Sequence, residues 1–266
     1  MDKKSLLSHI SFSRDFILDL IFPIECLGCG KEGIWLCQSC FRKLPVESEQ
    51  FCPGCKKTNK FGNFCSSCSP AYFLDGVWVA GNYKNKTIAS LIKNLKYHFA
   101  KDLSKILGQF LVSFLRNLIN KARINAVDLN TGISPENFEK VKKAPEIILD
   151  FNNCLIIPVP LHKKRERWRG FNQTKAIAEV VSRHFNLEIS HDLIRVKHRP
   201  PQAKLGAENR KENIRGCFSW QGENLENKKI ILLDDVATTG STLEECAKIL
   251  KQSGAKEVWG LVIARG

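Results

Sequence analysis

The feature that most constrains this chain is a set of eight cysteines between residues 26 and 68, arranged as four Cys-x-x-Cys pairs. A Cys-x-x-Cys turn directs two thiolates at one point, and two such turns complete a tetrahedral four-sulfur zinc site. Disulfides are the weaker interpretation, because we expect no secretory signal ahead of the cysteines. The sequence therefore predicts two structural zinc sites, with the ligands Cys26, Cys29, Cys37, Cys40, Cys52, Cys55, Cys65 and Cys68.

The four turns can pair in three ways, and the sequence leaves the pairing open. Spacers of 7, 11 and 9 residues separate successive turns. We prefer sequential pairing into two consecutive ribbons, because short spacers need the least loop closure. A cross-braced arrangement is the alternative. In either case about 50 residues build little core, so bound metal must supply folding energy.

The segment before the cysteines predicts an amphipathic helix between Leu6 and Phe22. Its apolar residues recur at near-helical spacing. Ser, His, Arg and Asp side chains interrupt it too often for a membrane-spanning helix, so we expect no stable membrane insertion.

A strand followed by a turn, within residues 229–250, predicts a phosphate site. The apolar run Ile230 to Leu233 is typical of a strand buried on both faces of a parallel sheet, and Asp234 and Asp235 follow it. A turn of small residues then enters a helix, whose unpaired N–H groups and dipole hold a phosphate. Two adjacent carboxylates need partners, which sugar hydroxyls or a Mg²⁺-bound substrate provide. The predicted site residues are Asp234, Asp235, Val236, Ala237, Thr238, Thr239, Gly240, Ser241 and Thr242.

The middle of the chain is strongly basic. The formal net charge is +14, and residues 161–216 hold 14 basic and 6 acidic side chains. Such an excess favours polyanions. At the turn after the strand that ends near Pro160, five cations surround Trp168, which suits pyrophosphate or, in a flexible loop, single-stranded DNA. Residues 197–218 predict a mobile flap over an anionic ligand. The predicted pyrophosphate and flap residues are Lys163, Lys164, Arg165, Arg169, Gly170, Asn172, Gln173, Arg199, Gln202 and Arg210.

These motifs resemble known proteins. The stretch from Asp234 to Thr242 is similar to the phosphoribosyl pyrophosphate (PRPP) motif of type I phosphoribosyltransferases. An upstream segment around Lys96, the Pro-Val-Pro-Leu-His block at 158–162 and the Arg-Gly-Phe-Asn-Gln block at 169–173 precede it in order. With the cysteine pairs, the chain resembles the ComF/ComFC family, also called GntX-like. The resemblance implies a zinc-ribbon head on a type I phosphoribosyltransferase fold, with the acid pair on the ribose hydroxyls and the turn on the 5′-phosphate.

We therefore expect an α/β fold with a mostly parallel sheet, preceded by a helix and a zinc-ribbon module. The expected domains are residues 1–72 and 73–266, with an insertion at 117–152. The resemblance implies a cytoplasmic, PRPP-binding protein acting in DNA uptake, natural transformation or DNA processing. Zinc, and Mg²⁺ with PRPP, are the expected cofactors. The expected partners are PRPP, single-stranded DNA and other competence or DNA-processing proteins. A genuine phosphoribosyltransferase of nucleotide salvage or biosynthesis is the alternative, and whether the protein turns over stays open.

Overall fold

The computed structural model describes residues 24–97, 101–128, 151–197 and 213–266. The chain divides into two compact units, Met1–Leu44 and Pro45–Gly266. The first unit contains one set of four cysteines and the short helix α2 (Gln38–Arg42). The predicted helix at 6–22 lies outside the described residues. The domain boundary predicted at 72/73 stays a prediction, although the division at 44/45 places the second set of cysteines with the α/β unit.

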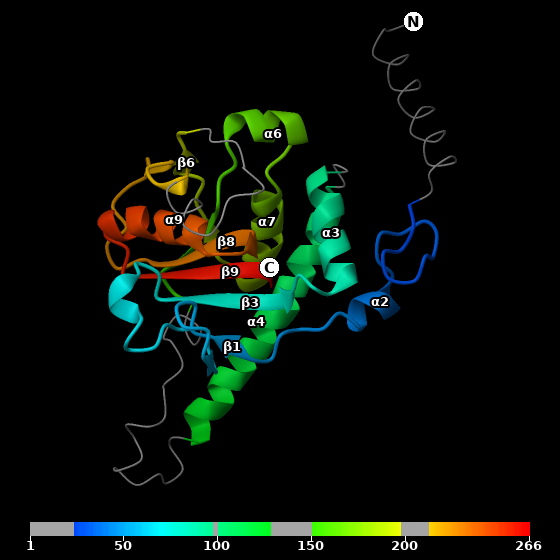
Figure 1. Ribbon diagram of the computed structural model, residues 1–266, viewed down its shortest axis with the longest axis horizontal. Helices are drawn as coiled ribbons and strands as arrows, with labels where there is room; N and C mark the ends of the chain where they lie inside the picture. The colour runs from blue at the N-terminus through cyan, green and yellow to red at the C-terminus, as the bar shows by residue number, and fades with distance from the viewer. Residues whose placement is uncertain (1–23, 98–100, 129–150, 198–212) are drawn as a thin grey trace, which may run out of the picture. The chain divides into compact units, whose positions relative to one another are not determined.

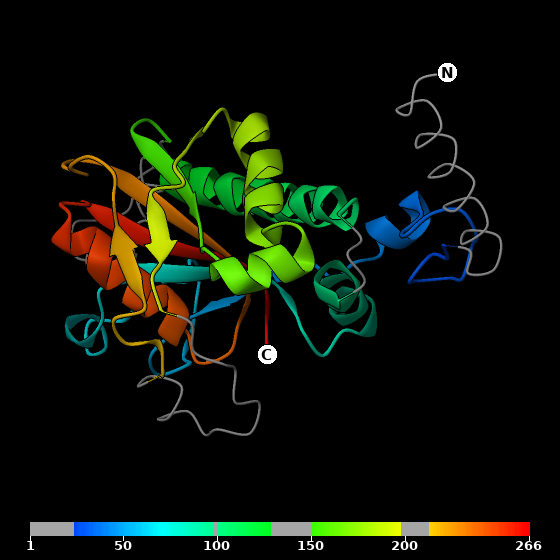
Figure 2. The same cartoon turned by 90° about the horizontal axis from the view of Figure 1, so that it is seen from above.

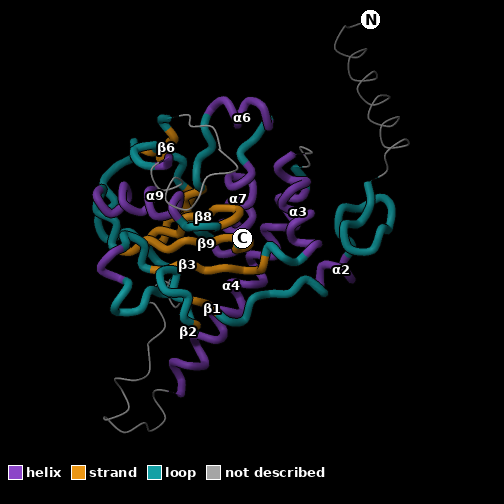
Figure 3. The backbone as a smooth tube through the Cα atoms, in the orientation of Figure 1, coloured by secondary structure: helices purple, strands orange, loops and turns teal. Residues whose placement is uncertain are grey.

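The second unit is built on a parallel five-stranded sheet in the order β3-β9-β8-β4-β5. The predicted α/β class with a mostly parallel sheet is confirmed. Figures 1 and 3 show β3, β9 and β8 running side by side. The strands of the sheet are β3 (Gly76–Asn82), β4 (Cys154–Pro158), β5 (Glu188–Ile189), β8 (Lys229–Ala237) and β9 (Glu257–Arg265).

Helices cover both faces of the sheet, as parallel strands require. In Figure 2 the orange helix α9 and the green helix α4 lie on opposite sides of the strands. Side chains of β8 alternate between these faces: Ile230 and Leu232 share a buried cluster with Leu243 of α9, while Ile231 and Leu233 are equally buried outside that cluster. The helices of this unit are α3 (Lys86–Tyr97), α4 (Leu103–Asp128), α6 (Lys163–Arg169), α7 (Gln173–Phe185) and α9 (Ser241–Gln252).

Helices α4 and α7 pack closely because a glycine faces a branched side chain at their contact. A Cβ atom on Gly108 would lie only 2.5 Å from Cβ of Val180. Any larger residue at 108 would therefore push the two helices apart. Residues 117–128 of the predicted insertion continue α4, and residues 129–150 lie outside the described part of the chain.

Two short antiparallel pairs flank the sheet. Strands β1 (Gln50–Phe51) and β2 (Thr58–Asn59) belong to the second ribbon, which also contains the 3-10 turn Ser69–Ala71. Strands β6 (Leu193–Arg195) and β7 (Phe218–Trp220) pair at the base of the predicted flap. Flap residues 198–212 lie outside the described ranges.

The second ribbon covers the free edge of the sheet at β3. The side chain of Gln50, which is 1% exposed, accepts from Val79 N at 2.9 Å and donates to Val79 O at 3.0 Å. Val77 N donates to Gly62 O at 2.9 Å. Unpaired strand edges promote intermolecular pairing, so these contacts protect β3. Figure 3 shows β1 and β2 beside β3.

Candidate functional site

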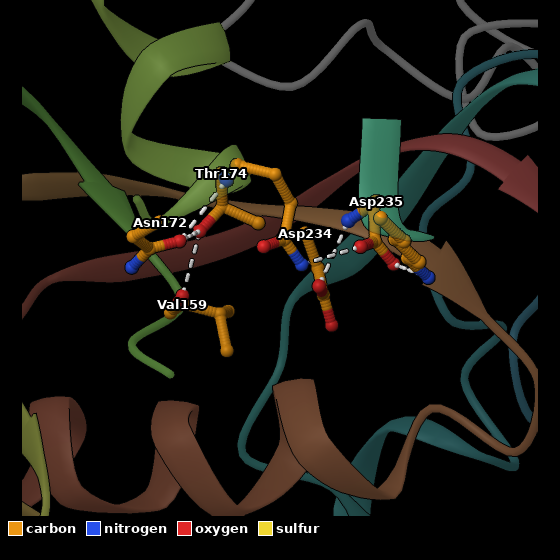
Figure 4. Close-up of polar contacts among 7 residues, drawn as sticks. Val159, Asn172, Thr174, Asp234 and Asp235 are labelled. Carbon is orange, nitrogen blue, oxygen red and sulfur yellow. Dashed lines mark hydrogen bonds and ion pairs between the residues drawn. The ribbon is translucent and has the colours of Figure 1, made fainter. Parts of the chain in front are cut away.

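The predicted acid pair lies near the carboxyl end of β8, inside the strand rather than after it. Asp235 is 5% exposed, and two side chains from separate helices bind its carboxylate. Lys96 Nζ of α3 lies 2.7 Å from Oδ1, and Gln173 Nε2 of α7 donates to Oδ2 at 2.9 Å. Figure 4 shows both aspartates with their polar contacts. The buried charge of Asp235 is therefore balanced by a cation and an amide.

Asp234 has a different environment from its neighbour. Its Oδ1 accepts from the backbone N–H of Asp235 at 2.8 Å. Burial, followed by the negative charge of Asp235, raises the pKa of Asp234 to about 7. Because Asp235 already has two side-chain partners, Asp234 is the carboxylate of the pair that is better placed to accept from a ligand hydroxyl.

The turn after β8 has the backbone geometry of an anion site. Gly240 adopts φ +75°, a left-handed conformation that favours glycine, and α9 begins at Ser241. The N-cap residue Gly240 has no side chain to cap α9, and Thr239 Oγ1 accepts from Ser241 N at 3.4 Å. Thr239 Oγ1 and Ser241 Oγ lie 2.8 Å apart. The N-terminus of a twelve-residue helix and two neighbouring hydroxyls thus adjoin the acid pair along the chain, which suits a sugar phosphate.

The basic segment after β4 forms a helix, not the flexible loop that the charge density suggested. His162 Nδ1 accepts from Lys164 N at 3.2 Å and begins α6. Gly170 ends the helix in the left-handed conformation, with φ +74°. Between them stand only residues compatible with a helix, without Gly or Pro. The expectation of a turn throughout this segment is wrong, because seven successive residues that tolerate a helix lie between the capping His162 and Gly170.

An open groove lies between α6 and β6. Among the charged residues of its lining, Lys and Arg outnumber the one acid, Glu166, and several apolar residues complete the lining. Trp168 is 60% exposed, so its ring is accessible to solvent. The basic side chains that line the groove are His162, Lys163, Lys164, Arg167, Lys175, His191 and Arg195.

The structure distributes the predicted pyrophosphate residues over several places. Lys163 and Lys164 line the groove, whereas Arg169 is 7% exposed. Asn172 accepts from Thr174 N at 3.1 Å and caps α7. Thr174 in turn donates to Val159 O at 2.7 Å, a contact that ties α7 to the end of β4 (Figure 4). Arg165 lies on α6, and the flap residues Arg199, Gln202 and Arg210 lie outside the described residues.

The cysteines form two clusters, Cys26/Cys29/Cys37/Cys40 and Cys52/Cys55/Cys65/Cys68. Within each cluster the sulfur atoms all lie within 4.8 Å of one another. A zinc ion bound to four sulfurs at about 2.3 Å holds those sulfurs about 3.8 Å apart. The Cys29–Cys37 and Cys55–Cys65 sulfurs are 3.7 and 3.8 Å apart, so both clusters fit zinc. Sequential pairing is confirmed, and cross-bracing is excluded.

Hydrogen bonds make the thiols of the first cluster differ in acidity. A hydrogen bond with Ser39 is the largest cause that lowers the pKa of Cys37 to about 6. A hydrogen bond with Cys37 is the largest cause that raises the pKa of Cys40 to about 12. Four thiolates cannot share this space without a cation, and a zinc ion supplies one.

Two domain families match the chain in the order that the fold shows. Residues 17–69 match a double zinc ribbon domain, and residues 175–265 match a phosphoribosyl transferase domain. Competence protein F of Haemophilus influenzae is 28% identical over 258 residues, which cover 91% of this chain and 98% of the relative. Competence protein ComFC of Bacillus subtilis is 26% identical, covering 94% and 89%. This chain is a homologue of the ComF/ComFC proteins.

Two further matches are partial. The DNA utilization protein YhgH of Escherichia coli is 33% identical over 109 residues, which cover 40% of this chain and 48% of the relative. Among solved structures, a glutamine PRPP amidotransferase from B. subtilis has a TM-score of 0.30 at 16% identity, covering 77% of this chain and 33% of that one. The latter likeness is too low to bear on the fold. Within the described part of the ComF-like chain, no helix is both long and apolar enough to cross a membrane.

Three cations of the candidate site in this chain were not predicted from its sequence. Lys96 comes from α3, 139 positions before its partner Asp235. Lys175 and Arg195 line the groove from α7 and β6. The segment around Lys96 contributes to the resemblance to the ComF family, but nothing in the sequence connects Lys96 with the acid pair. No local pattern distinguishes Lys175 or Arg195 from ordinary surface cations.

Proposed function

We propose that this protein binds PRPP with Mg²⁺ and acts in DNA uptake, natural transformation or DNA processing, together with other proteins of that process. The observation that carries the proposal is the acid pair at the carboxyl end of β8, held by Lys96 and Gln173 and followed by the turn into α9. Ligands of open parallel sheets bind at this end of the strands. We place the protein in the cytoplasm, because eight thiols in zinc-type clusters favour a reducing compartment.

In the proposed complex the turn from Ala237 to Thr242 holds the 5′-phosphate, and the acid pair accepts hydrogen bonds from the ribose hydroxyls. Mg²⁺, when bound, would neutralise part of the pyrophosphate charge. The exposed cations Lys163, Lys164 and Arg167 of α6 would bind the rest of that charge. Lys96 and Gln173 already fix Asp235, whose backbone N–H in turn donates to Asp234, so the acid pair is ordered before the ligand binds.

The test of PRPP binding is calorimetric titration with and without Mg²⁺. The double variant Asp234→Asn/Asp235→Asn removes two charged acceptors, each worth about 1.5–3 kcal/mol. We expect PRPP affinity to fall at least a hundredfold. Asp102→Asn, which changes an exposed acid directly before α4, is the matched control and should bind as the wild type does. A folded double variant with wild-type affinity would contradict the site.

For the DNA-related role we propose that the groove between α6 and β6 binds single-stranded DNA with little sequence preference. The cationic lining can follow a phosphate backbone, and the exposed ring of Trp168 can stack on a base. The lining of the groove includes the end of β4 and Asn172, the residue before α7. The first residue of α7, Gln173, binds Asp235 of the acid pair. DNA in the groove and PRPP at the acid pair would then bind next to each other.

A filter-binding salt series with single-stranded DNA tests the groove. Replacing Lys163, Lys164 and Arg167 by Ala should weaken binding and lower the salt slope by about 2, since each phosphate contact contributes about 0.7. Replacing the exposed Lys105, Arg116 and Arg123 of α4 by Ala removes the same charge elsewhere. Equal losses in the two triple variants would show that net charge, not the groove, binds DNA.

The alternative of a genuine phosphoribosyltransferase has its own readout. Release of pyrophosphate from PRPP on addition of one nucleobase or amine would assign turnover to this chain. Stable PRPP binding without release would favour the accessory role.

A further inference from the structure

One cation of the α6–β6 groove, Arg195 at the end of β6, lies where the two proposed sites meet. We propose that Arg195 binds a phosphate group of either ligand, so that single-stranded DNA in the groove and PRPP at the acid pair compete for its guanidinium. The inference rests on the proposed function and adds a regulation to it, because PRPP would then weaken the hold of the protein on DNA.

The end of the groove that contains Pro158 and Asn172 adjoins the acid pair. Pro158 lines the groove and is paired in the sheet with Leu233 of β8, and Asp234 is the next residue of that strand. Asn172 also lines the groove, and it precedes Gln173, whose side chain binds the other acid of the pair. A ligand at this end of the groove and a ligand at the acid pair would therefore be neighbours.

The backbone of Arg195 is held by a strand pair. Arg195 is opposite Phe218 in the β6–β7 ladder, and the next residue, Val196, donates from its N–H to Cys217 O at 2.8 Å. The guanidinium carbon lies 5.5 Å from the centre of the Phe218 ring, which is 4% exposed. A guanidinium placed over a buried ring has less freedom to lose when an anion binds.

The guanidinium has donor capacity that the described part of the chain does not use. Its Nε is buried and has no hydrogen-bond partner among the described residues, and within the same ranges the side chain forms no ion pair. A half-buried cation without a counter-ion favours an anion. The planar fork of a guanidinium fits two oxygens of one phosphate, a group that both DNA and PRPP carry.

Arg195 and Asp234 influence each other electrostatically. Burial raises the pKa of Asp234, and the positive charges of Lys96 and Arg195 oppose this rise. Burial lowers the pKa of Arg195, and the negative charge of Asp234 is among the influences that oppose this change. A ligand at the acid pair is therefore within the field of the same guanidinium that a DNA phosphate in the groove would use.

The cations of α6 are less suited to such competition. Lys163, Lys164 and Arg167 are exposed, so water and salt screen their charges. Arg195 is half-buried and is screened less. Any coupling between the two ligands should therefore depend on Arg195 more than on the other cations of the groove.

The test is the affinity for a fluorescent twelve-nucleotide thymine DNA, measured by fluorescence anisotropy with and without saturating PRPP and Mg²⁺. We expect PRPP to weaken DNA binding by the wild type about tenfold, within the usual range of coupling between two sites. Reciprocity requires DNA to weaken PRPP binding by the same factor, which calorimetry measures. In Arg195→Gln the coupling should fall below about twofold, because the shared cation is gone.

Arg167→Gln is the matched control, since it removes the same charge from the same groove but from the exposed side of α6. It should weaken DNA binding and keep the full coupling to PRPP. Arg195→Lys keeps the charge without the fork, so its coupling should lie between those of the wild type and Arg195→Gln. If circular dichroism shows that Arg195→Gln does not fold, reduced coupling in Arg195→Lys supports the inference and full coupling overturns it.

Failure of this inference is distinguishable from failure of the proposed function. If PRPP alone or DNA alone does not bind the wild type, the proposed function fails and the inference fails with it. If both bind, but PRPP leaves DNA affinity unchanged or raises it, only the inference is overturned. Equal coupling in the wild type and in folded Arg195→Gln also overturns it, because the competition would then come from net charge.

Discussion

Asp235 connects three distant segments of the chain through a single carboxylate. Lys96 of α3 binds one oxygen and Gln173 of α7 binds the other, while its backbone N–H donates to Asp234. Gln173 was predicted as a pyrophosphate residue, and the structure brings it to the acid pair. Sequence alone predicted the acids and the turn because both belong to one short segment. It could not place Lys96, because that contact depends on how α3 packs.

The raised pKa of Asp234 leads to a first prediction, the pH dependence of PRPP binding. The folded pKa of about 7 lies above the ordinary value of about 3.9, so ionisation between these pH values costs folding stability. Ribose hydroxyls and Mg²⁺ prefer the ionised form. PRPP–Mg²⁺ affinity should therefore rise about tenfold from pH 6 to pH 8, the change in the ionised fraction of such a group. Calorimetry across this range measures it.

The control for this pH dependence is Asp234→Asn, whose profile retains only the titration of PRPP itself. If the wild type and the Asn variant have parallel pH profiles, Asp234 does not titrate on binding.

The Lys96–Asp235 ion pair supports a second prediction. Its side chains are 20% and 8% exposed, so removing the cation leaves a nearly buried carboxylate without its charge partner. Lys96→Met should lower the free energy of unfolding by about 3 kcal/mol. Lys105→Met is the matched control, because its 3.4 Å pair with Asp102 is 72% and 77% exposed and should contribute less than about 1 kcal/mol. Urea denaturation compares them, and equal losses would contradict the structural role of Lys96.

At the scale of elements, each ribbon has two Cys-x-x-Cys turns, but the two ribbons have different surroundings. Cys52 and Phe64 of the second ribbon share a buried cluster with Leu243 and Leu250 of α9. Glu244 of α9 also accepts from Phe73 N at 2.7 Å, just after the ribbon. The first ribbon belongs to the other compact unit. The second metal site is thus part of the core that supports the phosphate turn.

Replacing one zinc ligand should therefore destabilise the α/β unit when the ligand belongs to the second ribbon, but not when it belongs to the first. Wild-type protein should contain about two zinc ions per chain, and Cys37→Ser and Cys65→Ser should each leave about one. Cys65→Ser should lower the melting temperature of the α/β unit by roughly 5–10 °C, because about 2–4 °C accompany each kcal/mol lost at this size. Cys37→Ser should leave that transition unchanged. Atomic absorption and near-ultraviolet circular dichroism measure the two quantities, and identical melting shifts would refute the distinction.

The elements differ in how far sequence could predict them. Zinc ligation follows from spacing alone, and β8 and α9 follow from an apolar run and a helical period. The pairing of Gln50 with Val79 has no local signal, since a glutamine that completes a sheet edge is indistinguishable in sequence from a surface glutamine. Helix α6 was missed for a different reason, because five cations obscured an ordinary helical segment between a capping His162 and Gly170.

For the whole molecule, the division at 44/45 gives a test with two fragments. Fragment 45–266 should fold, contain one zinc ion and bind PRPP as the full chain does, because it keeps the ribbon on β3. Fragment 73–266 loses Gln50 and Gly62, which cover the backbone of Val79 and Val77. We expect it to aggregate through the exposed edge.

Size-exclusion chromatography, zinc analysis and PRPP titration compare the fragments. A monomeric 73–266 fragment with full PRPP affinity would instead support the boundary that the sequence predicted.

The sheet joins strands from opposite ends of the chain. Asp75 Oδ2 accepts from Val258 N at 2.7 Å across 183 positions, and β3 pairs with β9 directly afterwards. A ribosome adds roughly 5–20 residues per second, so β3 waits on the order of ten seconds or more for its neighbour. During that interval the ribbon already covers one edge of the strand, while the other stays available for a chaperone or for misassembly. Completion of this sheet therefore has to wait until β9 has been synthesised.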